Sequence, residues 1–164
     1  MPQFDNCQRN MSVTFTTLHG KEKQIEPKDI IVRPAAYAIV IRDGAMLLLK
    51  VKTTRRWFFP GGGLHVDERL EAGLAREVQE ETGLQVRAES LFATLEHFFY
   101  YDPLDEAYHM YMFFYRAEII AGELKDVPQT GEETKEPQWV PIASLQEKDF
   151  DPVYQELVQQ IKQL

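Results

Sequence analysis

The sequence predicts an α/β protein, a single α/β/α sandwich in which a mixed β-sheet carries a helix on each face. Two nearly continuous apolar runs, at residues 35–41 and 45–51, indicate strands that are covered on both sides. An acidic amphipathic segment at residues 68–82 and a second amphipathic segment at residues 153–161 supply the two helices. We expect the acidic helix on one face of the sheet and the terminal helix on the other.

Short strands precede the main sheet. Residues 13–18 and 25–32 predict two modest strands joined by a turn at residues 19–20, and these strands could cover a sheet edge or serve a homodimer. The two longer apolar runs flank an Asp-Gly pair at residues 43–44, which is a strong hairpin signal. We expect this hairpin to form the core of the sheet.

The predicted acidic helix carries three carboxylates close together. At about 100° per residue, Glu77, Glu80 and Glu81 fall within roughly a third of the helix circumference, on its exposed side. They adjoin an apolar stripe formed by Leu70, Leu74 and Val78. Carboxylates three or four residues apart repel each other, at a cost of roughly a few tenths of a kcal/mol per pair on an isolated helix. A bound divalent cation would remove that cost.

Magnesium suits these carboxylates better than zinc does. Mg²⁺ takes oxygen ligands, keeps several waters and commonly bridges protein carboxylates to substrate phosphates. Zinc favours cysteine and histidine, whereas no cysteine lies near this segment and His65 stands alone. We therefore expect Mg²⁺ as the cofactor, with Mn²⁺ able to replace it.

Residues beside the carboxylates agree with an ion site. Glycines at residues 61–63 let the backbone approach an anion or a metal closely. Asp67 is the expected N-cap with Glu68 in the first turn, and Gly83 is the expected left-handed C-cap. Gly73 costs about 1 kcal/mol relative to Ala inside a helix. We infer that bulk is excluded at Gly73 to leave space for the metal and a phosphate.

The C-terminal half of the chain predicts the remaining elements. Residues 91–101 and 108–120 indicate two aromatic strands around a turn, with Phe113 and Phe114 in the core. A thick core and a stacking wall for a nucleobase both remain open for this segment, the pocket candidates being Tyr100, Tyr101, His109 and Tyr111. A short strand at residues 138–140 follows, and Asp151-Pro152 suits the start of the closing helix.

Composition limits the possible partners and compartment. The 164 residues suit one main domain, residues 33–164, after a strand extension at residues 1–32. The net charge of −8 disfavours duplex nucleic acid and membrane surfaces, although a small phosphorylated molecule remains compatible because bound Mg²⁺ changes the local charge. Cys7 is the only cysteine, and the polar start does not resemble a signal peptide. We therefore expect a cytoplasmic protein.

The region around the acidic helix resembles the signature of the Nudix hydrolases, a MutT-like family. The signature reads G-x5-E-x7-R-E-U-x-E-E-x-G-U, where U is aliphatic. Its fixed positions are matched here by Gly62, Glu68, Arg76, Glu77, Val78, Glu80, Glu81, Gly83 and Leu84. His65 and Asp67 depart from two looser family preferences, for Glu and Gly, which bear on the substrate subclass. The resemblance implies the Nudix fold over roughly residues 33–163.

The resemblance also implies a reaction. A Nudix hydrolase would cleave a nucleoside diphosphate linked to another moiety, by Mg²⁺-dependent attack of water at phosphorus. The implied metal ligands are Glu77, Glu80, Glu81 and a backbone carbonyl of Gly61 or Gly62. As catalytic groups, Glu77 or a loop glutamate would take the proton, Arg76 would orient the carboxylates through charge-assisted hydrogen bonds, and Glu68 would support that network.

Three further residues are candidates for binding the substrate. Arg56, or its neighbour Arg55, could hold a diphosphate, since guanidinium groups bind phosphate well, the favoured alternative being a solvated turn. Trp57 could stack on a base or belong to the core. Glu133 lies with Glu132 and Glu136 in a polar loop that could add a ligand or a base, the alternative being a solvated loop.

Two other classes of function compete with hydrolysis. A non-catalytic module that binds or senses a nucleotide or ADP-ribose would keep the fold, yet such drift usually damages the signature acids, and all are intact here. Processing of RNA ends is disfavoured by the acidic balance and the lack of a basic strip. The expected partner is a small nucleoside diphosphate derivative.

Overall fold

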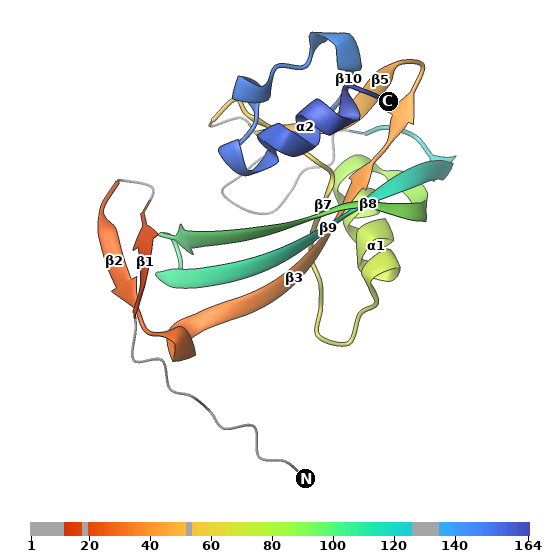
Figure 1. Cartoon of the computed structure of the whole chain (residues 1–164). Helices are drawn as coiled ribbons and strands as arrows, with labels where there is room; N and C mark the ends of the chain where they lie inside the picture. The colour runs from red at the N-terminus through yellow and green to blue at the C-terminus, as the bar shows by residue number, and fades with distance from the viewer. Residues whose placement is uncertain (1–11, 18–19, 52–53, 126–134) are drawn as a thin grey trace. The chain divides into compact units, whose positions relative to one another are not determined.

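The computed structural model describes residues 12–17, 20–51, 54–125 and 135–164, which form an α/β architecture with a mixed sheet and two α-helices (Figure 1). The elements in chain order are β1 (Val13–Thr16), β2 (Glu22–Ile25), β3 (Ile30–Ile39), β4 (Ile41–Arg42), β5 (Ala45–Val51), β6 (Trp57–Phe58), β7 (Gly61–Gly63), α1 (Leu70–Thr82), β8 (Leu84–Tyr101), β9 (Glu106–Gly122), β10 (Lys135–Pro141) and α2 (Gln155–Ile161).

The described residues form two compact units. One comprises the described residues up to Arg33 together with His97–Met110, and the other comprises Pro34–Glu96 with Tyr111–Leu164. The long strands β3, β8 and β9 each contribute residues to both units. The domain boundary at residue 33 and the homodimer stay predictions.

The larger unit contains the predicted Asp-Gly hairpin. Asp43 and Gly44 have φ values of 52° and 73°, which is the left-handed backbone that a two-residue turn requires, and β4 pairs with β5 across it. Most of the first predicted apolar run lies in β3, which belongs to a different sheet from β4 and β5. β5 lies in the order β10-β5-β4, with β6 paired to it, whereas β3 lies in the order β7-β3-β9-β8. The turn is therefore confirmed, but the hairpin across it is short, because most of the first predicted run pairs in the other sheet.

Alternate residues of β3 pack into different layers. Ala36 and Ala38 belong to a buried cluster with Leu74 and Val78 of α1. Tyr37, which lies between the two alanines, stacks on Phe114 with ring centroids 5.2 Å apart. Because successive strand side chains point to opposite faces, β3 has one alanine-rich face and one aromatic face.

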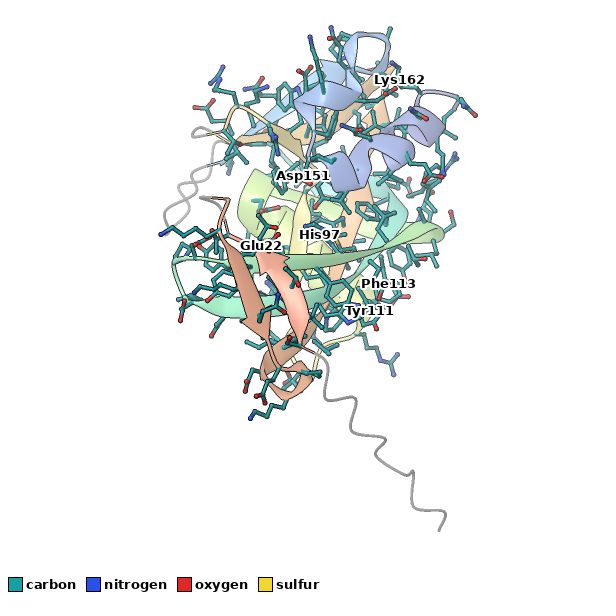
Figure 2. The ribbon with its side chains drawn as sticks, turned by 60° about the vertical axis from the view of Figure 1, so that its left-hand side comes forward. Glu22, His97, Tyr111, Phe113, Asp151 and Lys162 are labelled. Atoms are coloured by element: carbon teal, nitrogen blue, oxygen red, sulfur yellow. The ribbon has the colours of Figure 1, made fainter. Side chains whose placement is uncertain are left out.

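The aromatic face is covered by the C-terminal segment. The Tyr154 ring lies 6.0 Å from that of Phe114 and 5.7 Å from that of Phe59, and α2 follows directly with three buried apolar side chains, Leu157, Val158 and Ile161. Asp151 accepts a hydrogen bond from the Val153 N–H at 3.3 Å and caps a short 3-10 turn, Pro152–Tyr154. The closing helix itself begins later than predicted, because the N-cap of α2 is Tyr154. The segment runs from Asp151 to Lys162 in Figure 2. The sandwich predicted from the sequence is thus confirmed.

The smaller unit corrects one predicted strand. A 3-10 turn at Pro27–Asp29 ends β2 and separates it from residues 30–32, which begin β3. Proline has no N–H to donate to a sheet, so the predicted strand at residues 25–32 cannot continue through it. Tyr100, one of the predicted pocket candidates, lies in the same unit. It is buried with Phe15 and Ala107, and its hydroxyl oxygen lies 2.6 Å from Lys23 Nζ. Tyr100 therefore belongs to the core of this unit.

The predicted aromatic strands are confirmed as β8 and β9, which are both longer than expected. Phe98 stacks on His109 at 3.9 Å and Phe99 stacks on Tyr108 at 5.1 Å, so the rings pair between the strands. Phe114 is fully buried, as predicted. Tyr111 and Phe113 of β9, both labelled in Figure 2, are exposed and half-buried respectively. None of the helices in the described part of the chain is long and apolar enough to span a bilayer.

We predict that Val78→Ala destabilises the protein by about 2 kcal/mol, because the valine is fully buried on the inner face of α1 and loss of its methyl groups leaves a cavity. Urea denaturation measures the change. Val66→Ala is the matched control, since Val66 is fully exposed, and it should change the free energy of unfolding by less than about 0.5 kcal/mol. Equal effects of the two substitutions would contradict this packing.

Candidate functional site

Helix α1 carries most of the candidate site and begins later than predicted. Its N-cap is Arg69, with no hydrogen bond from the cap side chain, so Asp67 is not the N-cap and Glu68 lies before the first turn. Its end agrees with prediction, because Gly83 has a φ of 77° and donates its N–H to the Gln79 carbonyl at 2.9 Å.

Arg76 joins three of the signature carboxylates. Its Nε and Nη2 atoms each lie 2.9 Å from an oxygen of Glu68, which gives a bidentate ion pair. Its Nη1 atom lies 2.8 Å from Glu77 Oε1 and 3.3 Å from Glu80 Oε2. The planar guanidinium suits such paired contacts, and bonds between charged groups are roughly twice as strong as neutral ones. Arg76 therefore offsets the repulsion among these carboxylates.

The Glu68–Arg76 pair changes the acid–base behaviour of both groups. The Arg76 guanidinium depresses the pKa of Glu68 from 4.5 to about 2, and the His65 N–H, 3.2 Å from Glu68 Oε2, acts in the same direction. The bond to Glu68 is the largest cause that raises the pKa of Arg76. Glu68 is thus held in its charged form, although it lies outside the helix.

The glycine strand β7 lies against both β3 and α1. Gly61 has a φ of 135°, and a Cβ built on it would lie 2.2 Å from the Ala36 carbonyl oxygen. A Cβ at Gly62 would lie 2.7 Å from Glu77 Oε2. The Gly63 carbonyl accepts a weak hydrogen bond from Arg76 Nη2 at 3.4 Å. The backbone can come this close to the carboxylates only because the side chains are absent.

Glu81 is buried, which differs from the predicted exposed cluster. Only 5% of Glu81 is exposed, whereas the side chain of Glu80 is 60% exposed and that of Glu77 is 20% exposed. Glu81 Oε2 accepts the Gly61 N–H at 2.8 Å. A buried carboxylate needs such a partner, and this bond ties the end of α1 to the glycine strand.

The reason inferred for Gly73 is wrong. A Cβ at Gly73 would lie 2.2 Å from Leu64 Cδ2 and 2.8 Å from Glu68 Oε2. The loop before α1 therefore excludes a side chain at this position, and no bound group needs to be invoked. This loop also brings Glu68 to Arg76, which sequence spacing alone could not show.

The residues of the site fit a hard divalent cation by their chemistry. Glu77, Glu80 and Glu81 supply carboxylate oxygens beside the glycine backbone, and oxygen ligands are those that Mg²⁺ prefers. Gly62 lies so close to Glu77 that a Cβ would meet its carboxylate at 2.7 Å, so glycine is what allows the backbone and the carboxylate to lie side by side. Among the described residues, however, no three His, Cys, Asp or Glu side chains are already arranged to hold a metal.

The predicted substrate residues have other contacts in the structure. Arg56 Nη1 forms an ion pair with Asp151 Oδ2 at 3.0 Å. Trp57 is half-buried, and Lys50 Nζ lies 3.9 Å from its ring centroid. Glu133 lies outside the described residues. These contacts of Arg56 and Trp57 do not connect them to the Arg76 cluster.

Comparison with known proteins identifies the family to which the fold and the signature belong. A model of the NUDIX domain matches residues 32–161. The chain belongs to the Nudix family. Over 106 residues it is 31% identical to the 8-oxo-dGTP diphosphatase of Escherichia coli (strain K12), covering 65% of this chain and 74% of that protein. Over 137 residues it is 28% identical to the ADP-ribose pyrophosphatase of Methanocaldococcus jannaschii, covering 80% of this chain and 76% of that protein.

A shorter match and two solved structures complete the comparison. This Nudix chain is 43% identical over 56 residues to a MutT-like protein of Streptomyces ambofaciens, but spans only 36% of its length. The crystal structure of an ADP-ribose pyrophosphatase from Streptococcus suis 89-1591 has a TM-score of 0.56 and 22% identity, covering 79% of this chain and 86% of that chain. The MutT NUDIX hydrolase from Burkholderia pseudomallei has a TM-score of 0.58 and 22% identity, covering 80% and 98%. These structures show the shared Nudix fold.

We predict that Gly61→Ala destabilises the protein by more than about 2 kcal/mol, because the new Cβ meets the backbone of β3 and the backbone angle is strained. Gly44→Ala is the control, since it also has positive φ but has open space around it, and should cost about 1 kcal/mol. Urea denaturation compares the two variants. An equal loss would mean that the close approach of β7 to β3 does not matter.

We predict that the stability difference between the native protein and Glu68→Gln shrinks as the pH falls. A carboxyl group with a depressed pKa stabilises the fold above its ordinary pKa of 4.5, and this stabilisation is lost as the pH falls toward about 2. Thermal denaturation of both proteins between neutral pH and about pH 2 measures the difference. A difference that stays constant with pH would contradict the ion pair with Arg76.

Proposed function

We propose that this Nudix protein hydrolyses the diphosphate linkage of a small nucleoside diphosphate derivative with the help of a divalent cation. The observation that carries the proposal is the gathering of Glu68, Glu77 and Glu80 around Arg76, next to the glycine strand β7. Membership of the family and the names of the matched diphosphatase and pyrophosphatase support a pyrophosphohydrolase in general.

The proposed ligands of the cation are Glu77, Glu80, Glu81 and a backbone carbonyl, that of Gly62 or its neighbour Gly61. A bound Mg²⁺ or Mn²⁺ would polarise the phosphoryl oxygens and lower the pKa of a bound water. The fixed position of Glu81 supports its role, because its bond to the Gly61 N–H engages one oxygen, and a carboxylate can accept further bonds at its other lone pairs. The exposed carboxylate of Glu80 lies where an incoming ion can reach it.

The chain supplies the remaining groups of the reaction. Glu77 is the proposed general base, since it lies on α1 between the guanidinium of Arg76 and the backbone of Gly62. Arg76 orients the carboxylates, and Glu68 holds Arg76 through its bidentate ion pair. A loop glutamate such as Glu133 remains an alternative base from the sequence.

Several substrates share the required chemistry. The match to an ADP-ribose pyrophosphatase extends over 80% of the chain, and the match to an 8-oxo-dGTP diphosphatase over 65%. Both reactions break a phosphoric anhydride bond. We therefore propose a nucleoside diphosphate with a variable second group as the substrate class, with Arg56 and Trp57 as candidates for binding it. A cytoplasmic location and a homodimer belong to the same proposal.

We predict that Glu80→Gln lowers the rate of hydrolysis by about two orders of magnitude, because it removes a negative ligand of the cation. Nucleoside triphosphates, dinucleotide polyphosphates, nucleotide sugars and ADP-ribose, each with Mg²⁺, form the substrate panel, and release of phosphate or phosphomonoester is measured. Removing the cation with EDTA should stop the reaction.

Glu118→Gln is the matched control, since this exposed glutamate pairs with Arg87 on the strands β8 and β9. It should leave the rate unchanged. A native protein that binds a panel member tightly, yet hydrolyses none with Mg²⁺ or Mn²⁺, would favour a sensing module over an enzyme.

A further inference from the structure

Arg76 contacts two of the three carboxylates that the proposed function assigns to the cation, those of Glu77 and Glu80. One of its nitrogen atoms, Nη1, contacts both Glu77 and Glu80, at 2.8 and 3.3 Å. The described residues contain no three acidic or histidine side chains already arranged for a metal. The guanidinium thus contacts Glu77 and Glu80 in a structure whose described carboxylates are not yet positioned to hold a metal ion together.

A guanidinium and a divalent cation cannot both use these oxygens without cost. Each is positive, and two positive charges about 4 Å apart repel strongly where water is partly excluded. The side chain of Arg76 is only 24% exposed, so water screens this repulsion incompletely. Nη1 engages one oxygen of each glutamate, so we expect this repulsion to oppose binding of the cation and to weaken the contacts of Nη1 with Glu77 and Glu80.

Glu68 holds the other side of the same guanidinium. It binds Nε and Nη2, whereas Glu77 and Glu80 share Nη1. Glu68 is itself fixed by the His65 N–H at 3.2 Å. The guanidinium can therefore keep its bidentate ion pair while Nη1 gives up its two contacts.

We propose that Arg76 is an internal counter-ion that competes with the divalent cation for Glu77 and Glu80, and that Glu68 limits this competition by holding the guanidinium. This inference rests on the proposed function, because it concerns the cation of that site. It assigns Arg76 two effects of opposite sign: it orients the carboxylates for the reaction, and it weakens the binding of the cation.

Titration of the full-length protein with Mn²⁺, followed by calorimetry and by the electron paramagnetic resonance signal of free Mn²⁺, tests the proposal without relying on activity. Arg76→Gln should bind Mn²⁺ about five- to tenfold more tightly, because two partly exposed ion pairs no longer compete. Its turnover should nevertheless fall. A purely structural Arg76 predicts the reverse for binding, since disordered carboxylates would bind Mn²⁺ more weakly.

Arg87→Gln is the matched control, because it removes the same charge from an exposed ion pair with Glu118. It should leave the Mn²⁺ affinity within about twofold of the native value, as expected for a screened surface charge. If Arg87→Gln raised the Mn²⁺ affinity as much as Arg76→Gln does, the change in net charge alone would explain both gains, and the proposal would be overturned.

The double variant Glu68→Gln/Arg76→Gln separates direct competition from charge and from misfolding. It has the same net charge as the native protein, and it removes both partners of the ion pair together, which is far less disruptive than leaving one charge unpaired. The proposal expects it to bind Mn²⁺ more tightly than the native protein. Glu68→Gln alone should bind about threefold more weakly, since the released guanidinium turns to Glu77 and Glu80.

The outcomes distinguish this inference from the proposed function. If the native protein binds no Mn²⁺ and hydrolyses nothing, the proposed function fails. If the native protein binds Mn²⁺ and hydrolyses a substrate, but Arg76→Gln and the double variant bind Mn²⁺ equally or more weakly, the competition alone is overturned.

Discussion

One positive charge determines the arrangement of the acidic site. Arg76 is the cation that separates three glutamates, Glu68, Glu77 and Glu80. If it were absent, these three negative charges would repel one another. Arg76 binds all three, and its planar shape dictates that one carboxylate takes two nitrogen atoms while the other two share the third. The loop before α1 and the second half of α1 are therefore held by the same side chain.

The backbone of β7 also holds the acidic residues of α1 in place. Gly61 donates its N–H to Glu81, and Gly63 accepts from Arg76, so the strand contacts the helix at two points through main-chain groups. The same strand pairs with β3, where Tyr37 lies opposite Gly61. The sheet thus positions the carboxylates through a short glycine segment, and the chemistry of the site depends on the register of that pairing.

Local patterns predicted the local features well. The Gly83 cap, the turn at Asp43 and the two helices follow from backbone preferences and from apolar spacing, which act over a few residues. The burial of Glu81 and the contact of Gly73 with Leu64 could not be predicted in this way, because both depend on segments that meet only after folding. The spacing of Arg76 and Glu80, four residues apart on one helix, did contain the signal for their ion pair.

The alanine-rich face of β3 has a consequence for how this fold can diversify. Ala36 and Ala38 allow α1 to lie close to the sheet, whereas the opposite face is filled by large rings such as Tyr37 and Phe114. The layer under α1 therefore has little spare volume, and an enlarged side chain there would displace the acidic residues together. Segments that connect the strands do not meet this restriction, so substitutions there can alter the surface without moving α1.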